Sequence, residues 1–116
     1  MFFLTFFYIL AKKNMITEKD CGKEVYVFSF VDGSIEKGIL KYKPTINHFF
    51  IEIKVDDRFI FESYAPQITT FTSKKELMYF FKKDLHFDRK TKSKFIYVGL
   101  YYKMPLQKLL RKIKDL

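Results

Sequence analysis

Short apolar runs separated by turn residues dominate the stretch between residues 22 and 71. Residues 25–31 read VYVFSFV, and this β-branched and aromatic run predicts a strand that is covered on both faces. The Asp32-Gly33-Ser34 sequence that follows is typical of a hairpin turn. A second strand is predicted over residues 35–42, where Gly38 in the interior indicates a bulge or a sharp bend.

Two further runs have the same character. Residues 47–55 carry apolar side chains at every second position, and residues 58–64 follow after an Asp-Asp turn. A short fifth strand can be placed over residues 68–71. Because consecutive strands joined by short turns pair in antiparallel fashion, this half of the chain predicts a curled antiparallel sheet or a small SH3-like barrel of four or five strands.

The spacing of apolar residues becomes helical after residue 72. Ser73 is followed three residues later by Glu76, which is the spacing of a capping box, and a helix is predicted over residues 74–85. At 100° per residue, the core-facing stripe of this helix consists of Leu77, Met78, Phe81 and Leu85.

The last part of the chain predicts a loop, a strand and a second helix. A polar, basic loop is expected over residues 86–94, and the sequence FIYVGLYY predicts a strand over residues 95–102. Pro105 suits the first turn of a helix, and residues 106–116 are amphipathic. The chain is therefore predicted to be α+β, with the curled sheet followed by helix, strand and a C-terminal amphipathic helix.

Length and composition predict one domain. A chain of 116 residues, 48% of them hydrophobic, can bury a core of its own. We place this single α+β domain at residues 15–116, with a β-rich part over residues 22–71 and a basic helix-strand-helix part over residues 73–116.

Residues 1–14 form an apolar N-terminal segment with three open interpretations. The segment could be a buried extra strand of the core. It could be an extension ahead of a functional start at Met15. It could also be an interfacial membrane anchor assisted by Lys12 and Lys13.

Part of the β-rich half resembles an Sm-type motif. The residues that carry this resemblance, over about a quarter of the chain, are Gly22, Val25, Val27, Asp32-Gly33, Gly38, Leu40 and Asn47. They match the first half of the motif and imply a small barrel. The spacing between Gly22 and Gly33 departs from the pattern by one residue, Lys43-Pro44-Thr45 replaces an expected aspartate, and no Arg-Gly pair follows. The resemblance therefore implies neither membership nor RNA binding of the Sm type.

Charge is concentrated at the C-terminal end of the chain. Residues 1–72 hold nine Lys or Arg and nine Asp or Glu, whereas residues 73–116 hold thirteen Lys or Arg and four Asp or Glu, which is the whole net charge of +9. A clustered positive field attracts phosphates or an acidic protein face. A neutral, aromatic body with a cationic C-terminal third is more typical of a binding protein than of an enzyme.

The residues predicted to contact nucleic acid come from the first helix, the basic loop and the last helix. On the first helix an exposed tyrosine lies among lysines, so that its ring can stack on a base beside phosphate contacts. Because lysine outnumbers arginine and makes point-charge contacts, we expect weak sequence specificity for DNA or RNA. The candidate set is Lys75, Tyr79, Lys82, Lys83, Arg89, Lys90, Lys92, Lys94, Lys108, Arg111 and Lys112.

The cysteine and the histidines do not predict a catalytic or metal site. Cys21 could in principle use His48 or His86 as a base, but its neighbours do not mark a nucleophile. Together with Asp88, these residues have no close ligand spacing except His86-Phe87-Asp88, and they lack the paired spacing of zinc ligands. We predict no metal and no cofactor.

One short pattern resembles a nuclease site superficially. Metal-dependent nucleases combine an aspartate with a Glu-x-Lys element, and here Asp32 precedes Glu52-Ile53-Lys54. However, Glu52 and Lys54 are also the residues that an exposed strand face carries. We therefore predict that the protein is not an enzyme.

Protein recognition is the competing interpretation. The cationic surface could dock on an acidic partner surface, as in an accessory or inhibitor protein, and the last helix could lie in a partner groove. Membrane contact is not favoured, and the sequence predicts no particular oligomeric state. A single cysteine favours a reducing, cytoplasmic setting.

Overall fold

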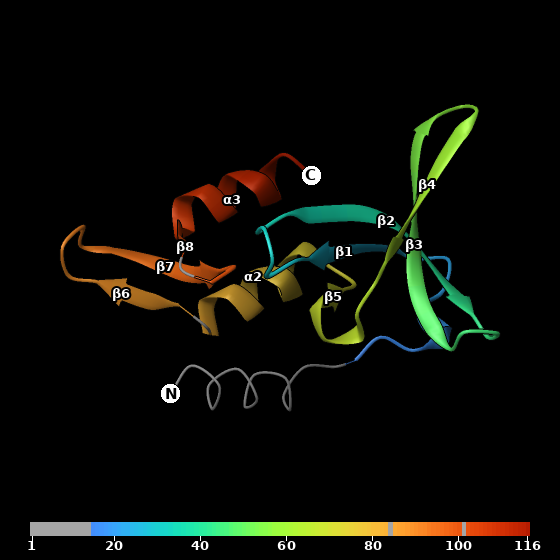
Figure 1. Cartoon of the computed structure of the whole chain (residues 1–116), viewed down its shortest axis with the longest axis horizontal. Coiled ribbons are helices and arrows are strands. Elements are labelled where there is room, and N and C mark those ends of the chain that lie inside the picture. The colour runs from blue at the N-terminus through green and yellow to red at the C-terminus, as the bar shows by residue number, and fades with distance from the viewer. Residues whose placement is uncertain (1–14, 84, 101) are drawn as a thin grey trace.

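A computed structural model describes residues 15–83, 85–100 and 102–116 (Figure 1). The predicted α+β class is confirmed, since the fold consists of a five-stranded antiparallel sheet, a three-stranded sheet and two α-helices. The interpretations of residues 1–14 concern a segment outside these ranges. Within these ranges, no helix has both the length and the apolar character needed to cross a membrane.

The first sheet has the strand order β4-β3-β2-β1-β5. Its strands are β1 (Glu24–Phe28), β2 (Ile35–Lys43), β3 (His48–Asp56), β4 (Phe59–Tyr64) and β5 (Thr70–Phe71). Two short 3-10 helices precede strands of this sheet along the chain, η1 (Glu18–Asp20) before β1 and η2 (Gln67–Thr69) before β5. The four main predicted strands therefore occur close to their predicted places.

The second half of the chain covers one face of this sheet. It begins with α2 (Lys74–Lys83), continues with β6 (His86–Asp88), β7 (Ser93–Val98) and β8 (Tyr102–Pro105), and ends with α3 (Leu106–Lys114). The three strands form a sheet of their own in the order β6-β7-β8.

β1 lies between two hydrophobic cores. Val25 and Val27 point into the first core, which is formed by Ile16, Leu40, Phe49, Ile51 and Ala65. Tyr26 and Phe28 point to the opposite face and into the second core, which is formed by Phe71, Leu77, Phe80, Phe81, Ile96, Val98, Met104, Leu109 and Ile113. The prediction that the first strand is covered on both faces is therefore correct.

Gly38 permits the curl of the sheet. A Cβ at this position would lie 2.8 Å from the carbonyl oxygen of Glu52 and 3.1 Å from the Cβ of Ile51, so only glycine lets β2 and β3 approach this closely. The curl brings Ser63 Oγ of β4 to 3.2 Å from Glu36 Oε1 of β2. The sheet stays open, since β4 and β5 occupy its two edges and do not pair.

α2 begins with the serine half of the predicted capping box, while the glutamate half bonds one residue further back, at Thr72. The backbone N–H of Glu76 donates to Ser73 Oγ at 3.1 Å, while the Glu76 carboxylate accepts from the backbone N–H and the hydroxyl of Thr72. The predicted core stripe is correct for Leu77 and Phe81. Phe80 also enters the core, and the predicted members Met78 and Leu85 are only partly buried against it.

The predictions for residues 86–102 are wrong in two respects. The predicted basic loop contains β6, a turn and the start of β7. The predicted single strand over residues 95–102 is broken at Gly99, where φ is 64° and the backbone N–H donates to Phe30 O at 2.6 Å. The chain then returns as β8, which pairs Tyr102 with Val98.

α3 packs its apolar face into its own domain. Leu109 and Ile113 lie in the second core against β7 and β8, and Lys112 Nζ donates to Gly33 O of the β1–β2 turn at 2.9 Å. The centre of the apolar face of this helix is therefore buried within the chain.

Replacing Gly38 should destabilise the sheet. In Gly38→Ala the new Cβ meets backbone atoms that cannot rotate away, so we expect a loss of about 1–3 kcal/mol in the free energy of unfolding, measured by urea denaturation. The exposed neighbour provides the control, since Lys37→Ala should stay within about 0.5 kcal/mol of the original chain. Equal effects of the two substitutions would contradict the close approach of β2 and β3.

Truncating α3 at its buried leucine should be costly. Leu109→Ala removes a fully buried side chain from the second core, and we expect a loss of about 2–5 kcal/mol in the same denaturation experiment. Lys114→Ala, on the exposed side of the same helix, should change the stability by less than about 0.5 kcal/mol. An equally small loss for Leu109→Ala would mean that α3 does not support this core.

Candidate nucleic-acid interface

α2 and α3 run antiparallel beside the second core, as Figure 1 shows. Lys74 Nζ, at the start of α2, donates to Leu116 O, beyond the end of α3, at 3.1 Å. At the other end, α2 leads into His86 of β6 and α3 starts after Pro105 of β8. His86 and Pro105 both pair with Phe95 of β7, so the C-terminus of α2 and the N-terminus of α3 lie at the same end of the three-stranded sheet.

The exposed face of α2 has the predicted combination of a ring and cations. Tyr79 is exposed, and Lys83 Nζ lies 5.1 Å from the centroid of its ring. Lys75 and Lys82 are also exposed. A cation that already rests on a tyrosine leaves the other face of that ring open to a planar group.

The β6–β7 turn projects the predicted loop cations into solvent. Asp88 accepts from the backbone N–H of Lys90 at 2.9 Å, and this bond, together with the nearby Lys103 ammonium, lowers the pKa of the Asp88 carboxyl. Lys92 has a positive φ of 53°, which helps to close the turn. The exposed cations of this turn and of the first part of β7 are Arg89, Lys90, Lys92 and Lys94.

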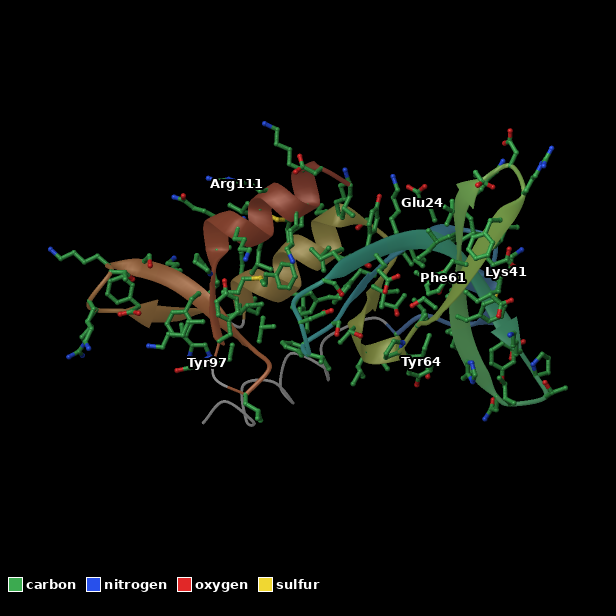
Figure 2. The ribbon with its side chains drawn as sticks, turned by 45° about the horizontal axis from the view of Figure 1, so that its top comes forward. Glu24, Lys41, Phe61, Tyr64, Tyr97 and Arg111 are labelled. Carbon is green, nitrogen blue, oxygen red and sulfur yellow. The ribbon has the colours of Figure 1, made fainter. Side chains whose placement is uncertain are left out.

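The cations of α3 differ in how free they are. Lys108 Nζ lies 5.5 Å from the ring centroid of Tyr102 and donates to its hydroxyl at 3.3 Å. Lys112 is committed to the β1–β2 turn through its bond to Gly33 O. Arg111 is exposed and points away from the protein (Figure 2). Arg111 is therefore available to a ligand, whereas Lys112 is partly structural.

Few of these cations have acidic partners. Within residues 73–83, 85–100 and 102–116, the one ion pair joins Lys103 to Asp88, with Nζ 3.6 Å from Oδ2. The other three ion pairs of the described chain lie in the neutral half. Exposed cations of the candidate set without an acidic partner among the described residues include Lys75, Lys82, Arg89, Lys90, Lys92, Lys94 and Arg111.

The structure brings part of the candidate set to one end of the molecule. Lys82 and Lys83 at the end of α2, the β6–β7 turn, and Lys108 at the start of α3 all adjoin the paired row of His86, Phe95 and Pro105. The β6–β7 turn borders Ser93, which lies two residues before Phe95, or about 7 Å along β7. Nearer the other ends of the helices are Lys75 on α2 and Arg111 and Lys112 on α3.

The aromatic residues of the three-stranded sheet are divided between its two faces. Tyr102 lies on the face that α3 covers, beside Lys108. Tyr97 lies on the opposite face and packs with Phe95 at a centroid distance of 5.0 Å and with His86 at 5.1 Å (Figure 2). Tyr97 therefore cannot share one flat surface with the cations of α3.

A separate hollow lies at the far end of the curled sheet. It has a volume of about 360 Å³ and is bordered by Tyr42, His48 and Tyr64, with the Asn47 and Gln67 amides at its side. The His48 and Tyr64 rings meet edge to face at 5.3 Å, and the Tyr42 hydroxyl bonds to Asn47 Oδ1. Residue spacing along the sequence does not reveal this hollow, because its walls come from the start of η1, from β2, β3 and the end of β4, and from the segment after β4.

The residues considered for catalysis come from different parts of the fold. Cys21 is half-buried at the end of η1, and burial together with the Glu18 carboxylate raises the pKa of its thiol. Asp32 accepts from the backbone N–H of Ser34 in the β1–β2 turn. In the described part of the chain there is no group of three His, Cys, Asp or Glu residues placed to hold a metal ion.

Comparisons of this chain with protein-family models, with curated proteins and with solved structures find no match.

The thiol of Cys21 should react slowly. A raised pKa leaves less thiolate at neutral pH than in a free cysteine, whose pKa is about 8.5, so alkylation by iodoacetamide should be slower and its pH midpoint higher. The same chain unfolded in guanidinium chloride is the matched control and should alkylate at the ordinary rate. Faster alkylation of the folded chain at pH 7 would contradict this environment and would reopen a nucleophilic role.

Proposed function

We propose that this protein is a small, non-catalytic, cytosolic binding protein that holds DNA or RNA through the phosphate backbone. The proposed contact surface is the cationic end formed by the C-terminus of α2, the β6–β7 turn and the N-terminus of α3, extended along the outer sides of both helices. We further infer that the open five-stranded sheet is a variant of the small SH3-like barrel.

The observation that carries this proposal is the unpaired charge. Ordinary solvated surfaces intersperse both signs of charge, whereas here one ion pair serves the described residues beyond residue 72. Seven cations of the candidate set are exposed without an acidic partner in that region, on three elements. Such a surface repels itself unless counterions or a polyanion neutralise it.

The same geometry supports weak sequence specificity. Lysines dominate the surface, and a lysine contacts a phosphate as a point charge, without the bidentate geometry that arginine uses to distinguish bases. Tyr79, held under Lys83, supplies a stacking face that accepts any base. We therefore favour single-stranded nucleic acid, or the frayed ends of duplexes, over a defined duplex sequence.

Binding should fall steeply with salt. With about five phosphate contacts, raising the salt from 50 to 200 mM should weaken binding roughly 10²–10³-fold, because bound counterions are released from the phosphates on binding. The measurement is fluorescence anisotropy with labelled single-stranded and double-stranded DNA and RNA. The double variant Lys82→Glu/Arg111→Glu should reduce the affinity at least about 10-fold and flatten the salt slope.

The matched control reverses two exposed lysines of the neutral half, Lys19→Glu/Lys37→Glu. It changes the net charge equally and should leave most of the affinity. If the two double variants lose equal affinity, net charge alone explains binding and the proposed surface is wrong. If no strand type binds at the lowest salt, nucleic acid is not the ligand, and an acidic protein partner becomes the interpretation to test.

A further inference from the structure

β4 exposes an unusual amount of apolar surface for a sheet edge. Phe59 and Ile60 are each 55% exposed, Phe61 is 48% exposed and Tyr64 is 61% exposed, and Val55 at the end of β3 is 62% exposed. Figure 2 shows Phe61 and Tyr64 on the half of the molecule away from Arg111. Natural sheets usually blunt an edge with lysine, proline or a covering loop, because an open apolar edge pairs with other strands.

The backbone of β4 offers free hydrogen-bonding groups along this edge. Opposite residues of an antiparallel pair alternate between exchanging both hydrogen bonds and exchanging none. The N–H of Ala65 donates to Phe49 O at 3.1 Å, in the register that pairs Tyr64 with Phe50. It follows from this alternation that Ile60, Glu62 and Tyr64 direct their N–H and C=O groups away from β3, toward the open side.

The other edge of the sheet cannot serve as the partner of β4. β5 has only two residues, Thr70 and Phe71, and both are buried. A head-to-tail contact between β4 of one molecule and β5 of the next would therefore require the domain to open. Within the five-stranded sheet, the long exposed edge that can pair with β4 is therefore β4 itself, in a second copy.

Charge selects one register for such a symmetric pair. If Ile60 lies opposite Ile60 of the second copy, Glu62 lies opposite Arg58 of the second copy, and this contact occurs twice. Moving the axis to Phe59 centres the pair on the first residue of β4, beside the Asp57-Arg58 turn, where little strand remains to pair. Moving the axis to Glu62 brings two glutamates together, which is unfavourable. With the axis at Phe61, Glu62 faces only Ile60.

Both members of the proposed contact are available. Glu62 Oε2 accepts from Lys43 Nζ at 2.6 Å, which leaves Oε1 open to a guanidinium. Arg58 is exposed in the β3–β4 turn, and its guanidinium has no partner among the described residues. In this register Arg58 lies between Asp57 of its own chain and Glu62 of the second copy. A guanidinium with these two acidic neighbours would be well placed for a charge-assisted hydrogen bond.

We propose that this protein forms a two-fold symmetric dimer through antiparallel pairing of β4 with β4, centred on Ile60 and fixed in register by Arg58 and Glu62. The two copies together expose about 1,000 Å² of apolar surface here, which is the upper limit of what the pairing buries and corresponds to a weak interface. We therefore expect a dissociation constant of about 1–100 μM. The proposal is independent of nucleic-acid binding, since the interface lies in the neutral half.

Sedimentation velocity on the full chain from about 2 to 500 μM, without nucleic acid, should show a monomer–dimer equilibrium in this range. Ile60→Lys places two ammonium groups face to face on the axis and should leave only monomer. Val31→Lys, at another exposed apolar residue, is the matched control and should dimerise normally. A monomer at all concentrations, an open-ended series of larger species, or a dimer unaffected by Ile60→Lys would each overturn the proposal.

Exchanging the two charges tests the register directly. Arg58→Glu alone and Glu62→Arg alone each create like-charge contacts and should weaken the dimer at least about 10-fold. The double variant Arg58→Glu/Glu62→Arg should recover most of the affinity. Circular dichroism of each variant separates this effect from unfolding. Failure of the double variant to recover any affinity, with the fold intact, would contradict the Ile60-centred register.

Cross-linking gives a second, independent readout. In a Cys21→Ser background, Ile60→Cys places two thiols on the axis with Cα atoms about 5.5 Å apart, within the range of a disulfide. The matched variant Glu62→Cys places its thiols about 13 Å apart in the same dimer. Oxidation should therefore give a covalent dimer for Ile60→Cys only, and equal cross-linking of both variants would contradict the register.

Discussion

The burial of β1 on both faces is the constraint on which the rest of the fold depends. Its odd-numbered valines point into one core and its aromatic residues into the other, so neither half of the chain is complete without this strand. Ile16 and the curled strands cover one face. The second half of the chain covers the other, which makes it part of the same domain and explains why α2 and α3 must turn their apolar faces inward and their cations outward.

The sequence predicts well what local pattern determines. β2, β3 and β4 follow from alternation and turn residues, and α2 follows from its Ser73 cap. The sequence does not predict the three-stranded sheet, because FIYVGLYY has no polar gap, so that only Gly99 signals the return of the chain, and because β6 is largely polar. The candidate cations were found by counting charge, but their gathering at one end depends on the pairing of β6, β7 and β8, which is not local. The exposure of β4 is likewise not predictable from local sequence, because it depends on the place of this strand in the sheet.

The exposure of β4 follows from the strand order. β1 carries both cores, and β4 lies three places away from it at the edge of the sheet, where neither core extends. Its aromatic residues resemble those of a buried strand in sequence but lack a layer to cover them. A protein of this size buries a limited fraction of its surface, and in this fold the buried surface lies mainly on the two faces of β1. An edge that is left apolar, with one cation and one anion spaced for a two-fold pair, is more readily explained by a partner strand than by chance.

The two proposed surfaces lie at opposite ends of the molecule, with the β3–β4 hairpin at one end of the longest axis and the β6–β7 turn at the other (Figure 1). A dimer through β4 therefore leaves both cationic ends open and directs them away from each other.

One long polyanion that reaches both ends of such a dimer would bind the second end intramolecularly, at an effective concentration set by the length of nucleic acid between the two ends. Short oligonucleotides could occupy only one end. The length of nucleic acid at which affinity rises would then report the span of the dimer, and charge-dependent binding and strand pairing would be coupled only for ligands longer than that span.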